Sequence, residues 1–275
     1  MLDKFKIGTK LITFFLLVGI IPLTFMGITA YSSAADAMAV EAENKLDAVA
    51  YLKKVQIDNM FHDIKANMMA VSGTNDIKNS FEAVVTYHKE MEIQPDQPYD
   101  MSSSKPGVTV PYDVLWEQVN SLMRVYPEQY GYYDIFIICA KHGHVMYSWA
   151  KERDLGTNLN TGPYRTSELA KVWEEIRSGK DYYITDTKPY APSDGAPAMF
   201  AGSPIKDDKG NSYGIVAVQI SQEAIDKIMQ EATGMGETGE TYLVGSDYLF
   251  RSNSRLSSDE TLLEVAVNTV GPQEA

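Results

Sequence analysis

Residues 133–149 read YDIFIICAKHGHVMYSW, which is two strand-like runs on either side of a polar turn. The first run is rich in aromatic and β-branched side chains, which suit the pleated surface of a sheet. The turn is Lys141-His142-Gly143-His144. The second run alternates, so that Val145, Tyr147 and Trp149 are expected on one face. The stretch therefore predicts a β-hairpin.

Strand and helix patterns continue toward the C-terminus. Strands are predicted over 181–187, 198–205 and 213–220, with a further strand-like run at 240–245 and a second hairpin starting near Asp247. Helices are predicted over 167–177 and 221–233. The side chains expected to point inward from the first of them are Leu169, Ala170, Trp173 and Ile176. Short turns link the strands, which favours one antiparallel sheet in an α+β domain over a parallel βαβ arrangement.

The chain before the hairpin begins with a membrane-spanning pattern. Leu11–Ala35 contains no charged residue and exceeds the roughly 20 residues that a helix needs to cross a hydrocarbon core. Lysines precede the run and acidic residues follow it, which places the N-terminus in the cytoplasm. The alternative is a signal peptide cleaved at Ala37-Met38-Ala39, but the apolar run exceeds the roughly 7–15 residues of a signal core. We therefore expect an uncleaved anchor.

A long amphipathic helix is predicted after the anchor, continuing it as a stalk. Its apolar stripe repeats at spacings of three and four, and Lys53 is its one charged member. The stripe is Leu46, Val49, Lys53, Ile57, Met60, Ile64, Met68 and Val71. The helix is expected to break near Gly73, with Asn75 or Asp76 capping a second helix.

Residues 93–111 contain four prolines and three consecutive serines, a composition that predicts a loop. A short helix is expected after it. The apolar side of that helix is Val114, Leu115, Val119, Leu122 and Met123. We expect one face of the sheet to pack on the long helix and the other to form a pocket under its own helix and loops.

Charge and motifs exclude several classes of function. The net charge is −13, which argues against a nucleic-acid partner because phosphates demand a basic surface. The single cysteine, Cys139, allows no internal disulfide. Gly234–Gly239 matches GxGxxG but follows a helix and precedes a strand, the reverse of a dinucleotide site. His142-Gly143-His144 and the Asp207-Asp208 turn lack the donor patterns of zinc and calcium sites. No cofactor, metal or catalytic residue is therefore predicted, and the chain is not expected to be an enzyme.

A cluster of aromatic and polar residues is the candidate binding site. A small charged ligand needs aromatic walls and one charged partner. The candidate residues are Tyr147, Trp149, Tyr164, Arg165, Trp173, Tyr183, Asp186 and Tyr190. The alternative is that several of the aromatic residues belong to the core with satisfied hydroxyl groups, and that Asp186 bonds to the backbone of its own loop.

Four stretches, taken in order, resemble the extracellular double-Cache (PAS-like) sensor of bacterial methyl-accepting chemotaxis proteins. They are 133–149, Asp181–Ile205 (DYYITDTKPYAPSDGAPAMFAGSPI), Asp207–Ile220 (DDKGNSYGIVAVQI) and Gly234–Val244 (GMGETGETYLV). Asp186 matches the pocket aspartate that binds the ligand ammonium in amino-acid sensors of this family. The Arg-x-Trp-Tyr run of many such sensors is absent, and its place reads Tyr164-Arg165-Thr166-Ser167.

The resemblance implies a domain organisation. Its parts are a cytoplasmic tail (1–10), a transmembrane helix (11–35), a stalk helix (36–92), a membrane-distal Cache module (93–233) and the start of a membrane-proximal Cache module (234–275) that is cut short. The second membrane helix, HAMP linker and signalling region of such receptors are not in this sequence, so we expect it to be an N-terminal fragment.

The resemblance also implies a function. The chain would be the periplasmic or extracellular sensor of a homodimeric chemoreceptor in the inner membrane, binding an amino acid, amine or organic acid and signalling through regions absent here. The same sensor could serve a histidine kinase or a diguanylate cyclase. A membrane-anchored extracellular enzyme and a purely structural or adhesive ectodomain are the other hypotheses.

Overall fold

The computed structural model describes residues 6–94, 97 and 110–267. The first part of the predicted tail, most of the predicted 93–111 loop and the end of the predicted second module lie outside these residues. The chain divides into two compact units, Met1–Leu52 and Lys53–Ala275. Helix α1, Ile7–Val71, is the first element.

The first unit contains the apolar part of α1. The most apolar 18-residue window of this helix has a mean hydropathy of 2.4, and none of that window is buried. Length and composition are therefore those of a helix that could cross a membrane. Pro22 lies inside the helix without ending it.

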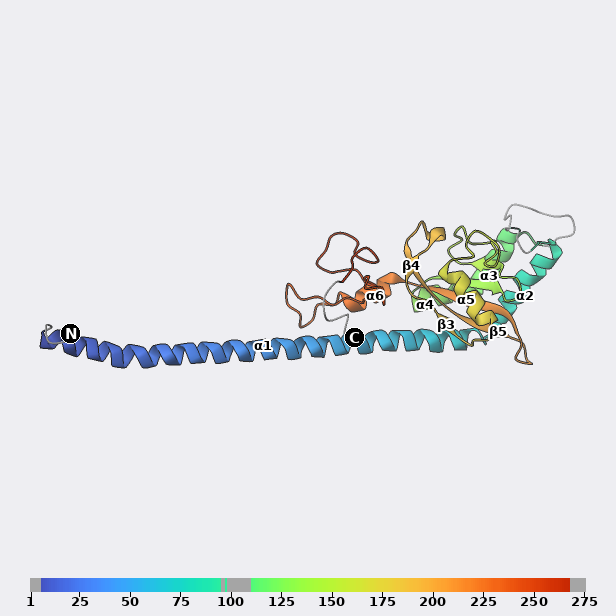
Figure 1. The fold of residues 1–275 in the computed structure, drawn as a ribbon. Helices are drawn as coiled ribbons and strands as arrows, with labels where there is room; N and C mark the ends of the chain where they lie inside the picture. The colour runs from blue at the N-terminus through green and yellow to red at the C-terminus, as the bar shows by residue number, and fades with distance from the viewer. Residues whose placement is uncertain (1–5, 95–96, 98–109, 268–275) are drawn as a thin grey trace. The chain divides into compact units, whose positions relative to one another are not determined.

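The second unit is built on an antiparallel sheet, which confirms the predicted α+β class (Figure 1). The hydrogen-bonded order is β2-β1-β6-β5-β3, and β4 pairs with β5. The strands are β1 (Tyr132–Cys139), β2 (Val145–Ser148), β3 (Tyr183–Ile184), β4 (Lys188–Pro189), β5 (Pro197–Lys206) and β6 (Ser212–Ile220). Strands β5 and β6 are the longest of these six strands, because each is a continuous run of mostly buried residues. A turn at 207–211 joins them.

Helices cover both faces of the sheet. One face carries Ile135, Val216 and Val218, which form a core with the C-terminal half of α1. Three further helices complete that layer: α2 (Asn75–Glu90), α3 (Tyr112–Met123) and α4 (Val125–Tyr130). The opposite face packs under α5 (Glu168–Arg177), whose four predicted inward residues are all buried. The predicted packing of one face of the sheet on the long helix is thus confirmed. The opposite face carries a hydrophobic core under α5, and the pocket predicted there remains a prediction.

Two glycines let elements approach the sheet closely. A Cβ atom built on Gly202 of β5 would lie 2.5 Å from Val172 Cγ1 of α5. A Cβ atom on Gly214 of β6 would overlap the ring of Phe81 from α2. A helix therefore lies directly against each glycine, one on each face of the sheet.

Three local predictions are wrong. Thr74, not Asn75 or Asp76, caps α2, because its backbone is extended and its Oγ1 accepts a hydrogen bond from the N–H of Ile77. Val114 and Leu122 of α3 are exposed, because the helix buries the adjacent stripe of Tyr112, Leu115, Trp116, Val119 and Met123.

The third wrong prediction concerns β2. The pairing of β1 with β2 shifts between Ile137 and Ile138, as in a β-bulge. Because one slipped position moves a side chain to the other face, Val145 lies in the core under α5 and Tyr147 in the core of the helix layer. The two side chains therefore do not share a face.

The C-terminal part of the described chain begins with α6, Gln222–Met229, which is shorter than the predicted 221–233 helix. The predicted strand and second hairpin appear only as the isolated bridges Val244↔Phe250 and Leu249↔Ala266.

Lys53 of α1 is 5% exposed. Its Nζ donates to the carbonyls of Ile228 at 2.5 Å and Glu231 at 2.9 Å, at the end of α6. The charged member of the apolar stripe is therefore a C-terminal cap for another helix.

Candidate ligand-binding site

Two of the eight predicted site residues lie on the helix-layer side of the sheet. Tyr147 is fully buried, stacks on Trp116 with ring centroids 5.9 Å apart, and donates to Asn120 Oδ1 at 3.1 Å. Burial raises its pKa well above the ordinary tyrosine value. Trp149 is half-buried and packs against the same core.

Three others lie on the α5 side. Trp173 is buried and donates from Nε1 to the carbonyls of Cys139 and Ala140, each at 3.1 Å. Tyr190 is 2% exposed and Tyr183 is half-buried. The remaining aromatic and basic pair, Tyr164 and Arg165, is half-buried and exposed respectively. The structure thus divides the predicted residues between the two faces and the surface instead of bringing all of them together.

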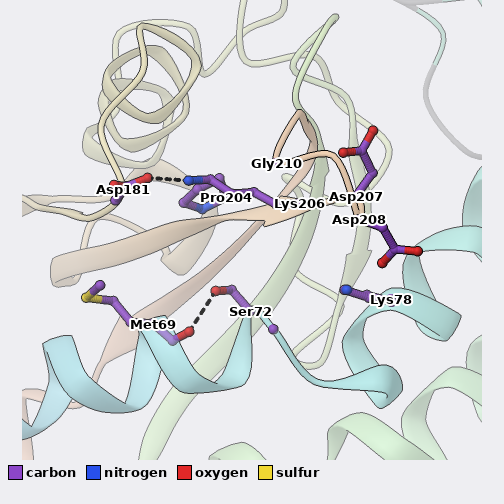
Figure 2. Close-up of a pocket in the computed structure, with 10 residues that line it drawn as sticks. Met69, Ser72, Lys78, Asp181, Pro204, Lys206, Asp207, Asp208 and Gly210 are labelled. Carbon is purple, nitrogen blue, oxygen red and sulfur yellow. Dashed lines mark hydrogen bonds and ion pairs between the residues drawn. The ribbon is translucent and has the colours of Figure 1, made fainter.

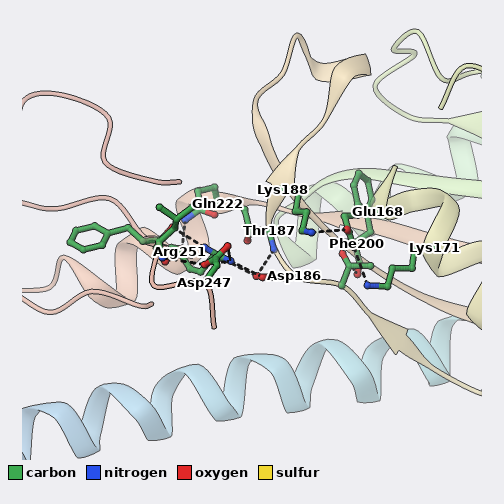
Figure 3. Close-up of polar contacts among 12 residues, drawn as sticks. Glu168, Lys171, Asp186, Thr187, Lys188, Phe200, Gln222, Asp247 and Arg251 are labelled. Carbon is green, nitrogen blue, oxygen red and sulfur yellow. Dashed lines mark hydrogen bonds and ion pairs between the residues drawn. The ribbon is translucent and has the colours of Figure 1, made fainter. Parts of the chain in front are cut away.

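Asp186 forms an ion pair with a residue that the sequence did not single out. Arg251 donates to it from Nε at 2.7 Å and from Nη2 at 2.8 Å, and also to Asp247 at 2.8 Å (Figure 3). The Arg251 side chain is 7% exposed, whereas those of its two partners are about half exposed. The guanidinium holds the pKa of Asp186 below its usual range. A ligand ammonium at Asp186 would share this carboxylate with Arg251.

The polar end of the α5 face is a buried cluster. Strand register pairs Asp134 with Gln219, and Phe136 with Ala217 and Ser148. Asp134, Ser148 and Gln219 therefore lie on the face that also carries the aromatic core under α5. All three are no more than 4% exposed.

Asp134 is held by surrounding donors. Its Oδ1 accepts from the backbone N–H groups of Ile135, Trp149 and Ala150, and its Oδ2 accepts from Ser148 Oγ at 2.6 Å. Burial raises the pKa of this carboxyl to about 8, and the hydrogen bonds oppose the rise. Both oxygens of Asp134 therefore accept hydrogen bonds within the protein, and two of these bonds hold the backbone of Trp149 and Ala150 beside the sheet.

Asp154 differs, because only one of its oxygens is bonded to another side chain. Tyr190 Oη donates to Oδ2 at 2.5 Å. Oδ1 is buried and has no hydrogen-bond partner among the described residues. Burial raises the pKa of the Asp154 carboxyl to about 6, so the group is mostly ionised at neutral pH. A buried acceptor that forms no hydrogen bond is costly to the stability of the folded state. This site is therefore suited to a ligand that brings an N–H donor and a positive charge.

The rim of the cluster is also acidic. Tyr133 donates to Glu152 Oε1 at 2.7 Å, and Ser193 donates to Oε2 of the same carboxylate at 2.6 Å. The bond to Glu152 raises the pKa of Tyr133 to about 12. Glu152 in turn contributes to the raised pKa of Asp154. The surroundings of Asp154 therefore favour a cation over an anion.

The cavities of the second unit differ in charge. A cavity of about 480 Å³ lies beside the β5–β6 turn, and its lining mixes Lys78 and Lys206 with three aspartates (Figure 2). Lys206 is already paired with Asp181 at 2.5 Å. A second cavity, of about 520 Å³, is lined by Tyr133, Ser193 and Gln219 from the edge of the buried cluster.

Two of the residues that the sequence prediction missed left a signal in the sequence. Asp134 interrupts the apolar strand YYDIFIIC, and Gln219 interrupts GIVAVQI. A polar residue within a buried strand needs a hydrogen-bond partner, so these two interruptions could have indicated a buried polar cluster. Asp154 and Arg251 lie in irregular segments, and only tertiary structure shows that they are buried.

Comparison with known proteins supports the fold. No protein-family model matches the chain, and no curated protein matches it. Among solved structures, the sensor domain of the Vibrio cholerae histidine kinase DctB matches with a TM-score of 0.50 and 14% identity, over 87% of this chain and 74% of that one. At this identity the likeness shows the fold, which is that of Cache-type, PAS-like sensor domains.

Two chemoreceptor domains match less well. The Pseudomonas fluorescens CtaA ligand-binding domain in complex with L-isoleucine has a TM-score of 0.37 and 14% identity, over 79% of this chain and 74% of that one. The Campylobacter jejuni Tlp3 sensory domain with isoleucine bound has a TM-score of 0.36 and 13% identity, over 71% and 72%. These two neighbours are a ligand-binding domain and a sensory domain of chemoreceptors.

Proposed function

We propose that this chain is the extracytoplasmic sensor region of a transmembrane receptor, and that it binds a small solute carrying an ammonium group. The observation that carries the proposal is the buried, unpartnered Oδ1 of Asp154. A fold of the Cache type and a helix able to cross a membrane support it. The receptor lies in the inner membrane with its N-terminus in the cytoplasm, and the sensor faces the periplasm or exterior.

The chemistry of the site narrows the ligand classes that the sequence left open. Amino acids and amines bring the ammonium that the Asp154 oxygen lacks, whereas an organic acid would bring a second negative charge to buried carboxylates. One residue of the predicted set, Tyr190, lies at this site through its hydrogen bond to Asp154. The other predicted residues remain candidates for contacts outside this cluster.

Signal transmission is proposed to run through α1. Its C-terminal half forms one core with the sheet, so a ligand that favours one arrangement of the sheet also biases the helix. A methyl-accepting chemotaxis output in a homodimer is the assignment we favour. A histidine kinase or diguanylate cyclase output would use the same sensor.

A thermal-unfolding screen of the full chain in detergent micelles tests the proposal. Amino acids, amines, organic acids and purines are compared, and an ammonium-bearing ligand is expected to stabilise the protein by RT ln(1 + [L]/Kd), about 2.7 kcal/mol at a hundredfold excess over Kd. Asp154→Asn should abolish the shift. Asp194→Asn is the matched control, because that side chain is 92% exposed.

Three results would contradict the proposal. They are stabilisation by organic acids alone, no stabilisation by any compound, and an unchanged shift in Asp154→Asn. The orientation is tested separately with alkaline phosphatase fused after Ala275, which should be active only if the sensor is outside the cytoplasm.

A further inference from the structure

The cavity of about 520 Å³ lies where the end of β6 meets α6 and the 253–262 segment. Its lining includes three carboxylates: Glu223 and Asp226 from α6, and Glu260 from the C-terminal segment. None of the described residues that line it is a lysine, arginine or histidine. None of the three carboxylates forms an ion pair with a described residue, although nine such pairs are found elsewhere in the described chain.

A buried amide provides an independent sign of a missing partner. Gln219, one of the lining residues, is 4% exposed, and its Oε1 has no hydrogen-bond partner among the described residues. A buried amide oxygen is costly to leave without a hydrogen bond, and a donor in the cavity would remove that cost. The cavity therefore combines carboxylates that have no basic partner among the described residues with an unsatisfied amide oxygen.

The acidic wall is held in place by hydrogen bonds. Asp226 Oδ1 accepts from the N–H of Asn253 at 2.7 Å, and Oδ2 accepts from its Nδ2 at 3.0 Å. Asn253 Oδ1 in turn accepts from the N–H groups of Thr261 and Leu262. These bonds join α6 to the segment that carries Glu260, so the two backbone segments that line the cavity are held together before any ligand arrives.

We propose that this cavity is a second binding site, separate from Asp154, for a linear organic cation with two or more ammonium groups. Among the described residues, no three acidic, histidine or cysteine side chains are placed to hold one metal ion. The carboxylates are therefore too widely spaced for a single ion, while spaced ammonium groups can pair with them one by one. The ligand would bridge α6 and the 253–262 segment.

Isothermal titration calorimetry of the full chain in detergent micelles tests the site, with spermidine as the probe and n-butylamine as the singly charged comparison. Spermidine is expected to bind more tightly than n-butylamine. The double variant Glu223→Gln/Glu260→Gln should weaken spermidine binding about tenfold, since exposed ion pairs contribute modestly. Asp259→Asn, an exposed carboxylate outside the lining, is the matched control and should bind as the wild type does.

Asp154→Asn separates this site from the one proposed above. Retained spermidine binding in that variant supports the second site, whatever the thermal screen shows. Loss of binding in Asp154→Asn would overturn the second site, because it would assign the polyamine to the first. Wild-type affinity in the double variant, or displacement of spermidine by Ca²⁺ at equal ionic strength, would also overturn it.

Discussion

Arg251 holds Asp186 through two parallel hydrogen bonds, Nε to Oδ1 at 2.7 Å and Nη2 to Oδ2 at 2.8 Å. The two residues are 65 positions apart, so the pair joins the loop after β3 to the C-terminal segment. Bidentate geometry of this kind is among the stronger ion-pair arrangements. The buried partner is the arginine, and its charge depends on two half-exposed aspartates for compensation.

Replacement of Arg251 should therefore destabilise the second unit. Arg251→Met removes the donors of Asp186 and Asp247, and we expect a loss of about 1–3 kcal/mol in the free energy of unfolding. Urea unfolding measures it. Arg153→Met is the control, because its partner Asp194 is 92% exposed and such a pair contributes about 0–1 kcal/mol. Equal effects of the two substitutions would contradict the structural role of Arg251.

Lys53 and Lys54 provide a matched pair of neighbouring lysines. The buried Lys53 caps the end of α6, whereas Lys54 is exposed and pairs with Asp58 one turn away. Lys53→Met should cost about 1–2 kcal/mol of stability, because it leaves helix-end carbonyls without a donor. Lys54→Met should cost less than about 0.5 kcal/mol. A thermal melt with the reverse order would mean that α6 does not depend on this ammonium.

The contact between β5 and α5 predicts an overpacking effect. Gly202→Ala would place a Cβ 2.5 Å from Val172 Cγ1, and we expect a loss of about 1–3 kcal/mol. Adding Val172→Ala should recover part of that loss. Gly73→Ala, whose Cβ would meet only ordinary contacts, serves as the control. If the double variant were no more stable than Gly202→Ala alone, the close approach of α5 would not explain the effect.

The raised pKa of Asp154 predicts a pH dependence of stability. The pKa in the folded state is about 6, above the ordinary aspartate value of 3.8. Between these values the folded state binds more protons than the unfolded state, so the contribution of Asp154 is complete below about pH 4 and is lost as the pH rises through 6. The contribution amounts to about 3 kcal/mol, at 1.36 kcal/mol per pKa unit.

The measurement compares unfolding free energies of the wild type and Asp154→Asn from pH 4 to pH 7. The variant should show a shallower slope between pH 4 and pH 6, where only the contribution of Asp134 then remains of the two. A slope above pH 6 is expected to persist in both proteins, because burial also raises the pKa of Asp134, to about 8. Parallel curves for the two proteins would show that Asp154 titrates normally.

The elements with strong periodicity could be predicted from the sequence. Strands β1, β5 and β6 are long apolar runs bounded by turn residues, and α5 has a clean apolar stripe after its Ser167 cap. The face of Val145 could not be predicted, because a shift of register at Ile137 and Ile138 depends on how the two strands pair and not on either strand alone.

The candidate site was harder to predict than the fold. Tyr147 and Trp173 were grouped as aromatic walls for a small charged ligand, yet they pack on opposite faces of the sheet. Asp186 was predicted to bind a ligand ammonium, and the structure instead shows its carboxylate paired with Arg251, which lies 65 residues away and is not indicated by any local sequence pattern. Long-range pairing of charges is a tertiary property, which a single sequence does not display.

The overlap of Phe81 with the space above Gly214 links two positions that are distant in the sequence. Substitutions at the two positions are coupled, because a side chain at position 214 requires a smaller residue at position 81. Among relatives of this chain, we expect the two positions to vary together, with aromatic residues at 81 accompanied by glycine at 214. A β6 strand that gained a larger side chain would be inherited only after α2 had lost its ring.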